Sequence, residues 1–138
     1  GKRSGARLIA GGGVPDDRPR GWFVAPTVFA DVDNSDRIAQ EEIFGPVLAV
    51  IPYDSDDQAI ALANDTKFGL QAAIFTADIT KALKAVGSLD FGGVLVNGVP
   101  TWRADQQPYG GLRDSGNTRE GPAFSVKEMT EIRMVVLG

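Results

Sequence analysis

The chain has 138 residues, a length that suits one domain with its own core. Its 43% hydrophobic and 23% charged residues are typical of a globular protein and argue against long disorder. The net charge of -4, with Lys and Arg scattered along the chain, argues against a nucleic-acid partner. Cysteine and histidine are both absent, which removes disulfides, thiolate nucleophiles and the usual zinc and copper ligands, so no metal site is predicted.

Nothing in the sequence predicts a membrane span or a signal peptide. The longest uncharged stretches, residues 43–53 and 91–102, are too short and too rich in Gly and Pro to cross a bilayer. Basic residues occur among residues 1–10, but no apolar segment follows them. We therefore expect no membrane partner, and a cytoplasmic protein is the simplest interpretation.

Residues 1–36 predict little regular structure. Residues 8–10 indicate a short strand within a loop region, and residues 22–29 indicate an edge or irregular strand because Pro26 interrupts them. The glycines at 11–13 lack the spacing of a phosphate-binding loop, and the acidic stretch 31–36 lacks the glycine and the closing glutamate of a calcium loop. A flexible turn and a solvated turn with helix-capping carboxylates are favoured, and a small phosphate- or calcium-binding protein stays an alternative.

A regular alternation of strands and helices begins at residue 47. Residues 47–52 predict a buried strand, and Ser55 with Gln58 forms a capping box for the helix that follows. The inward face of this helix is expected to consist of small and aliphatic side chains, namely Ala59, Leu62 and Ala63. Gly69 is expected to end the helix, and residues 70–76 predict a second strand.

Asp78 caps the next predicted helix, and Gly87 is expected to end it. The apolar positions of this helix recur at helical spacing and predict an inward face made of Ile79, Ala82, Leu83 and Val86. A third buried strand at residues 94–96 ends in Asn97. The short alternation predicts right-handed parallel crossovers in one sheet that is covered on both faces, which is half of a doubly wound α/β domain.

Residues 98–121 are polar, rich in glycine and longer than an ordinary loop, which is typical of functional segments. Pro122 suits the first residue of a short helix over 123–129. Residues 131–137 then alternate as an amphipathic strand that needs a partner sheet, for which another subunit is a candidate. We therefore expect two parts, residues 1–121 and residues 122–138.

Several sequence strings occur in fixed order: EEIFGPV at 41–47, TKFGLQAAIFT at 66–76, GGVLVNG at 92–98, PYGGLRDSG at 108–116 and MTEIRMV at 129–135. Together they resemble the C-terminal part of an NAD(P)-dependent aldehyde dehydrogenase, over essentially the whole chain. The resemblance implies a parallel-sheet half of the catalytic domain plus a C-terminal oligomerisation strand. It also implies a homo-oligomer, or pairing with the missing N-terminal part. It does not indicate which aldehyde is oxidised, whether NAD or NADP is used, or how many subunits assemble.

The resemblance assigns cofactor contacts to the first string. Glu42 would accept hydrogen bonds from the ribose on the nicotinamide side, because an ionised carboxylate is an acceptor only. Phe44 would pack near the nicotinamide ring, with Gly45 allowing close approach of the backbone and Pro46 fixing the turn into the strand. Glu41 is expected to be merely solvated. The alternative for Glu42 and Phe44 is an ordinary solvated carboxylate and an ordinary core ring.

The resemblance also assigns contacts with a small aldehyde. Asn97 lies at the carboxyl end of a predicted parallel strand, where ligands usually bind, although it could simply cap the strand end. Tyr109 would line the aldehyde entrance or pack within its loop. Arg103 would bind a carboxylate or phosphate of the substrate, or form a surface ion pair with Asp105. Glu120 would assist proton transfer as a catalytic residue, although Thr118 stands where the family more often has glycine.

The reaction of this family starts with a cysteine thiolate that attacks the aldehyde, and the chain contains no cysteine. We therefore expect the nucleophile, and the thiohemiacetal that it forms, to belong to polypeptide outside this chain, and the chain alone to be inactive. A non-catalytic oligomerisation or interaction module derived from the same fold is the alternative.

Overall fold

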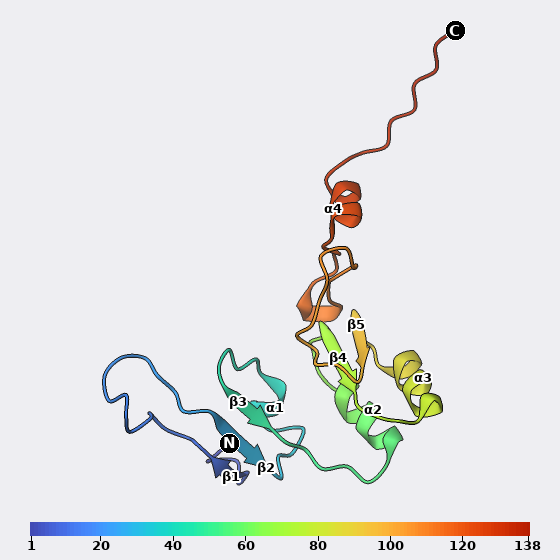
Figure 1. Ribbon diagram of the computed structural model, residues 1–138. Coiled ribbons are helices and arrows are strands. Elements are labelled where there is room, and N and C mark those ends of the chain that lie inside the picture. The colour runs from blue at the N-terminus through green and yellow to red at the C-terminus, as the bar shows by residue number, and fades with distance from the viewer. The chain divides into compact units, whose positions relative to one another are not determined.

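The computed structural model describes residues 1–138 and divides them into two units, Gly1–Asp65 and Thr66–Gly138. The first unit contains β1 (Arg7–Ala10), β2 (Thr27–Ala30), α1 (Arg37–Gln40), β3 (Val47–Ala49) and α2 (Asp56–Asn64) (Figure 1). The second contains β4 (Gln71–Ile74), α3 (Ile79–Ser88), β5 (Gly93–Val96), the 3-10 turn η1 (Arg113–Ser115) and α4 (Pro122–Glu128). None of these helices has the length and apolar character that a membrane span needs. The predicted division after residue 121 stays a prediction.

In the first unit, β2 is the middle strand of a three-stranded sheet. It pairs antiparallel with β1, with a bulge between Leu8 and Ala10, and parallel with β3. Its inward side chains, Thr27 and Phe29, are buried. The prediction of an edge or irregular strand over residues 22–29 is therefore wrong in its edge position for residues 27–29, which lie in the middle strand, and residues 22–26 form no regular strand. The strand begins only at Thr27, so Pro26 lies outside the ladder that it would interrupt.

The capping box predicted for α2 is confirmed for Ser55, which caps the helix through its hydroxyl. The Ser55 hydroxyl accepts a hydrogen bond from the N–H of Gln58 at 3.2 Å, and the Gln58 side chain reaches back to the N–H of Asp54. The helix ends at Asn64, so the prediction that Gly69 ends it is wrong. The helix-capping role predicted for the acidic stretch is also wrong, because Asp36 at the N-cap of α1 makes no side-chain cap bond.

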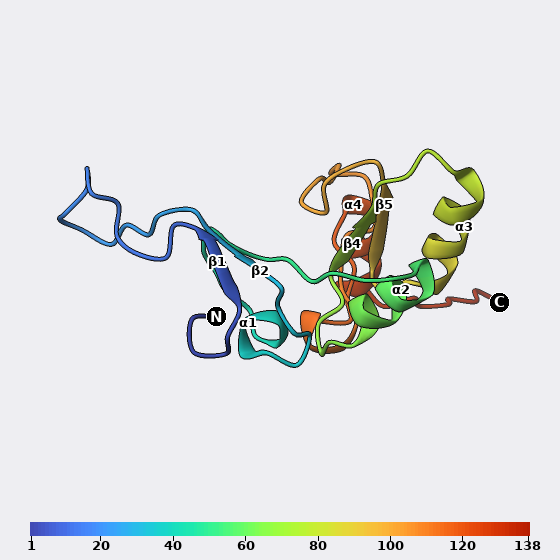
Figure 2. The same cartoon turned by 90° about the horizontal axis from the view of Figure 1, so that it is seen from below.

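In the second unit, β4 and β5 form a parallel pair, with Ala72 opposite Val94 (Figures 1 and 2). Asp78 caps α3 as predicted, since its carboxylate accepts hydrogen bonds from the N–H groups of Thr80 and Lys81. The helix continues through Gly87 to Ser88, one residue beyond the predicted end.

The predicted inward face of α3 is only partly correct. Ala82 and Ala85 are buried, whereas three larger apolar side chains stay exposed: Ile79, Leu83 and Val86. The helix contacts β5 through its alanine side, so its larger apolar side chains have no cover within this chain.

The α/β fold with parallel strands is confirmed, but the single sheet predicted for the strands after residue 47 is not what the structure contains. β3 belongs to the sheet of β1 and β2, and β4 pairs with β5 in a separate two-stranded sheet. Hydrophobic runs identify strands, but the partner of each strand depends on long-range contacts that the runs do not specify.

After β5 the chain makes a long excursion before α4 begins at Pro122, the residue predicted to open it. Residues 129–138 contain no helix or strand and run on from α4 (Figures 1 and 2). The oligomerisation strand predicted at residues 131–137 therefore forms no ladder within one chain. It stays a prediction that depends on a partner.

Candidate functional site

Two adjacent carboxylates after α1 have different surroundings. The chain leaves the helix at Glu41, whose carboxylate accepts a 2.6 Å hydrogen bond from the Nε of Arg37 one turn earlier. Glu42 is exposed and makes no hydrogen bond or ion pair. The helix end therefore holds one carboxylate in place and leaves the next one available to an outside donor.

Glu42 lines a hollow of about 410 Å³ between the N-terminal segment and α1. Three side chains around it carry charge or a hydroxyl that could contact a polar ligand, namely Arg3, Ser4 and Arg37. Glu42 is thus the carboxylate of this hollow with no partner inside the chain.

Phe44 follows on a turn that leads into β3. Its side chain is 98% exposed, so it is not part of a core. Two consecutive short-range bonds shape the turn, from the N–H of Gly45 to the carbonyl of Ile43 and from the N–H of Val47 to the carbonyl of Gly45, both 2.8 Å. A Cβ built at Gly45 would meet no atom within 4 Å, so the packing of this chain does not require glycine there.

Neither alternative ligand site of the first unit has the geometry of a site. In the glycine turn, the N–H of Gly12 donates to the Thr27 hydroxyl at 2.8 Å and its carbonyl accepts from Lys2, so its polar groups point to the chain itself. In the acidic stretch, Asp31 pairs with Arg7, and Asp33 accepts from Ser35. No group of three or more acidic residues in the chain converges on one point.

The pKa of Asp33 is lowered from its usual 3.8, first by the Ser35 hydroxyl and second by the Ser35 N–H, both of which donate to the same carboxylate oxygen. This interaction belongs to a tight turn and involves none of the residues predicted to bind the cofactor or the aldehyde.

In the second unit, three of the predicted site residues lie together. The guanidinium of Arg103 is 4.4 Å from the ring centroid of Tyr109, and its Nη1 is 3.0 Å from a carboxylate oxygen of Glu120. Tyr109 and Glu120 also exchange backbone hydrogen bonds as an isolated antiparallel bridge. The pairing of Arg103 with Asp105 that the sequence left open is absent, because this bridge brings Glu120 to Arg103 instead.

Thr118 adopts none of the backbone conformations that favour glycine, although the family more often has glycine there. Its presence is therefore compatible with the position of Glu120. Beside the Tyr109–Glu120 bridge, glycine is needed at Gly110 instead, because a Cβ there would lie 2.1 Å from the Thr118 carbonyl oxygen.

Asn97 acts as a link between strand ends. It follows β5 in a left-handed conformation with φ of 55°, which asparagine tolerates better than most residues. Its amide accepts from the N–H of Thr76 and donates to the carbonyl of Thr76, both at 2.9 Å. An amide has a second N–H and a second lone pair, so Asn97 can still contact a ligand.

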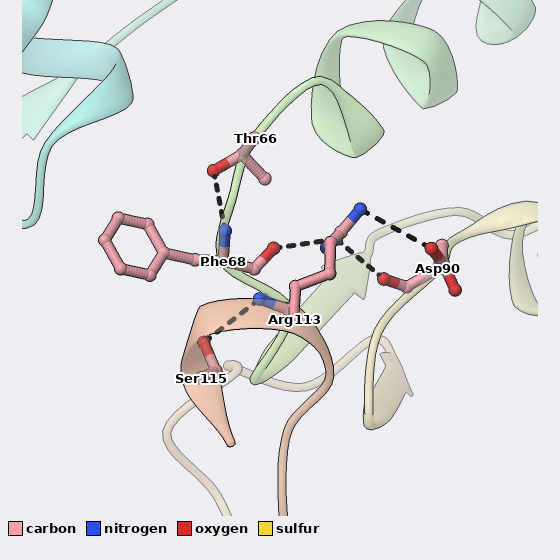
Figure 3. A network of polar contacts seen from close by, with 6 residues as sticks. Thr66, Phe68, Asp90, Arg113 and Ser115 are labelled. Carbon is pink, nitrogen blue, oxygen red and sulfur yellow. Dashed lines mark hydrogen bonds and ion pairs between the residues drawn. The ribbon is translucent and has the colours of Figure 1, made fainter. Parts of the chain in front are cut away.

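Arg113 was not singled out from the sequence, yet it holds the segment after Tyr109 in place (Figure 3). Its Nη2 donates to the carbonyls of Phe68 at 2.7 Å and Asp90 at 2.8 Å. Beside it, the Ser115 hydroxyl accepts from the N–H of Gly69 at 3.0 Å. The only sequence signal for this network is a polar string, residues 113–115, within a glycine-rich stretch.

Comparison with known proteins gives consistent results over nearly the whole chain. The sequence profile described as the aldehyde dehydrogenase family matches residues 1–135. The 3-sulfolactaldehyde dehydrogenase of Priestia aryabhattai is 40% identical over 133 residues, which are 96% of this chain and 27% of that protein.

Solved structures agree with the sequence comparison. An aldehyde dehydrogenase of Mycobacterium tuberculosis complexed with NAD+ is 46% identical, with a TM-score of 0.87 over 95% of this chain and 27% of that one. Aldehyde dehydrogenase 21 of Physcomitrella patens, complexed with the reaction product succinate, is 41% identical, with a TM-score of 0.85 over 94% of this chain and 26% of that one. The chain thus spans about a quarter of the length of these relatives.

Proposed function

The chain belongs to the aldehyde dehydrogenase family, and from this premise we propose that it is the C-terminal part of an enzyme that oxidises an aldehyde to a carboxylic acid with NAD or NADP. The observation that carries the proposal is the difference between two neighbouring carboxylates. Glu41 is bound by Arg37, whereas Glu42 has no partner and lines a hollow. Glu42 is therefore the carboxylate that would hold the cofactor.

The residues after α1 fit such a cofactor. Glu42 would accept hydrogen bonds from the ribose hydroxyls on the nicotinamide side. Phe44 carries an exposed ring that would pack near the nicotinamide, and the open space at Gly45 would let a ligand approach the backbone. When bound, NAD(P) supplies the two-electron acceptor. This chain contributes the contacts that orient it.

The cluster of Arg103, Tyr109 and Glu120 would bind the aldehyde. The guanidinium lies against a ring and is positioned by a carboxylate, so it presents its remaining N–H groups in a fixed direction, to which an anionic substituent would bind. One carboxylate oxygen of Glu120 contacts Arg103, and the other would accept a proton from water. Asn97 would contact the substrate through its remaining N–H.

The named substrates of similar proteins differ in charge: several relatives are betaine aldehyde dehydrogenases, whose substrate carries a cationic group, and two similar proteins are associated with anionic compounds. One relative is a dehydrogenase of 3-sulfolactaldehyde, and another was solved with succinate as its reaction product. Each compound bears an anionic group, the chemistry that a guanidinium recognises.

We infer that the cysteine nucleophile and its thiohemiacetal belong to polypeptide outside these 138 residues, since the chain has no cysteine. Its exposed surface supports a missing partner. The chain exposes 10410 Å². Two separate globular units of equal size with the same total mass would expose only about 8,300 Å² together.

Activity measurements test the proposal. The purified chain should form no NADH from aldehydes. A chimera in which this chain replaces the matching segment of the Mycobacterium tuberculosis relative should form NADH. In the chimera, Glu42→Ala should raise the KM for NAD+ by about tenfold or more, because a hydrogen bond to a charged group is lost. Glu41→Ala removes only an exposed ion pair and is the matched control. It should change the KM for NAD+ by less than about twofold.

A well-folded chimera without activity, or equal effects of the two substitutions, would contradict the proposal. A defined oligomer of the chain together with an inactive chimera would favour the alternative, a non-catalytic oligomerisation module.

A further inference from the structure

A second hollow lies beside the Arg103, Tyr109 and Glu120 cluster. It measures about 180 Å³ and lies between the parallel strands and the segment before Tyr109. Four side chains with uncharged polar groups line it: Gln71, Trp102, Gln107 and Tyr109. No charged residue contributes to its lining, so the hollow suits a neutral polar group.

None of these four side chains makes a hydrogen bond within the chain. The carbonyl oxygen Oε1 of Gln71 is buried and without a partner, which is unusual because buried polar atoms are nearly always paired. An unpaired buried acceptor destabilises the free chain, so a ligand that donates a hydrogen bond to Gln71 Oε1 removes this cost when it binds. The side-chain torsion that carries the amide has a broad preference, so rotation can present either end of the amide to the hollow.

Tyr109 connects this hollow to the proposed anion contact, because it lines the hollow while its ring lies 4.4 Å from the Arg103 guanidinium. A ligand that reaches both the Arg103 guanidinium and the hollow needs two groups on neighbouring carbons. One group is anionic, and the other can donate and accept hydrogen bonds. A hydroxyl both donates and accepts, and so it can pair with a carbonyl oxygen, an amide N–H or an indole N–H.

We propose that the hollow lined by Gln71 and Trp102 binds a hydroxyl-bearing carbon of the substrate, so that the enzyme acts on short hydroxylated aldehydes with an anionic end. This inference rests on the proposed function, in which Arg103 binds the anionic end. It adds that Gln71 determines specificity for the hydroxyl.

Two three-carbon carboxylates, glycerate and propionate, serve as probes because they differ only in hydroxyl groups. The 138-residue chain, labelled with 15N, is titrated with each probe while the side-chain amide of Gln71 and the indole N–H of Trp102 are followed by NMR. Glycerate should bind about threefold to tenfold more tightly than propionate and should shift both signals. Equal affinities, or glycerate shifts confined to other residues, would overturn the inference.

Gln71→Leu should remove the preference for glycerate, because leucine keeps the approximate size and loses the amide. Gln106→Leu is the matched control, since this exposed neighbour lies outside the hollow, and the preference should persist. If Gln71→Leu unfolds the chain, the comparison of the two probes on the unsubstituted chain still decides. A preference that survives in folded Gln71→Leu would count against a role of Gln71.

Arg103→Gln separates this inference from the proposed function. It should weaken both probes by a similar factor and leave the ratio between them unchanged. If Arg103→Gln changes neither affinity while Gln71→Leu removes the preference, the proposed anion contact fails and the hydroxyl site stands. If Arg103→Gln weakens the binding of both probes and the unsubstituted chain shows no preference for glycerate, the proposed anion contact stands and the hydroxyl site fails.

Discussion

The side-chain amide of Asn97 binds both backbone polar groups of Thr76. It accepts a hydrogen bond from the Thr76 N–H and donates one to the Thr76 carbonyl, each at 2.9 Å. The two residues follow the neighbouring parallel strands β5 and β4. The amide thus fixes the carboxyl ends of the two strands together.

Asn97→Ala should destabilise the second unit by about 2–3 kcal/mol, because it removes two hydrogen bonds and leaves at positive φ an alanine, which lacks the polar side chain that lets asparagine tolerate this conformation. Asn97→Gly should destabilise the unit by only about 1–2 kcal/mol, because glycine loses the same hydrogen bonds but adopts a positive φ without steric cost. Urea unfolding measures both. Asn117→Ala, at an exposed position without hydrogen bonds, should stay within about 0.5 kcal/mol. Equal losses for the alanine and glycine substitutions would contradict the conformational argument.

Arg113 should control the order of the segment that follows Tyr109. Arg113→Ala removes the donors to Phe68 and Asp90, and the N–H of Gly69 should then exchange with solvent at least about tenfold faster in hydrogen-exchange measurements. Arg113→Lys should restore protection only partly, since an ammonium lacks the planar fork of a guanidinium. Arg133→Ala, in the segment without regular structure, is the control and should leave the exchange of Gly69 unchanged.

Local features of this fold could be predicted from the sequence because they depend on residues close in the chain. Ser55 and Asp78 cap their helices because the groups that they bind lie two or three residues away. Pro122 begins α4 because the first N–H of a helix has no partner within the helix, so proline is tolerated there. Helix ends were predicted less well. Gly87 tolerates a helical position next to the true end, so its presence does not stop the helix.

Long-range relationships could not be predicted from the same patterns. Arg103 pairs with Glu120 rather than with the nearby Asp105 because the chain folds back at the Tyr109 bridge. Periodicity correctly grouped Ile79 and Leu83 on one apolar side of α3, but it could not tell that nothing in this chain covers them. The contacts expected of Glu42 and Phe44 with a cofactor stay predictions, although both side chains are free to make them.

The carboxylate of Asp33 should titrate below its usual pKa of 3.8 in the folded chain. Ser35→Ala removes the hydroxyl, the larger cause, and keeps the backbone N–H, so the pKa should rise but stay below 3.8. NMR titration of the Asp33 side chain measures both values. Because the folded pKa is lowered, the stabilisation is present above the unfolded pKa and is lost as the pH falls through the folded value. A pKa that does not change in Ser35→Ala would show that the hydroxyl is not the cause.

The terminal segment should govern self-association. Ile132 and Met134 share one side of an alternating sequence and are 102% and 85% exposed, so they are available to a partner sheet. If this side pairs with another subunit, Ile132→Glu should shift the chain toward monomer in light-scattering measurements, because a carboxylate would be buried in an apolar interface. Arg133→Glu changes the charge on the opposite side and should leave the oligomer intact. An unchanged mass in Ile132→Glu would place the subunit contact elsewhere in the chain, and equal dissociation in both variants would show that the contact does not depend on the side of Ile132 and Met134.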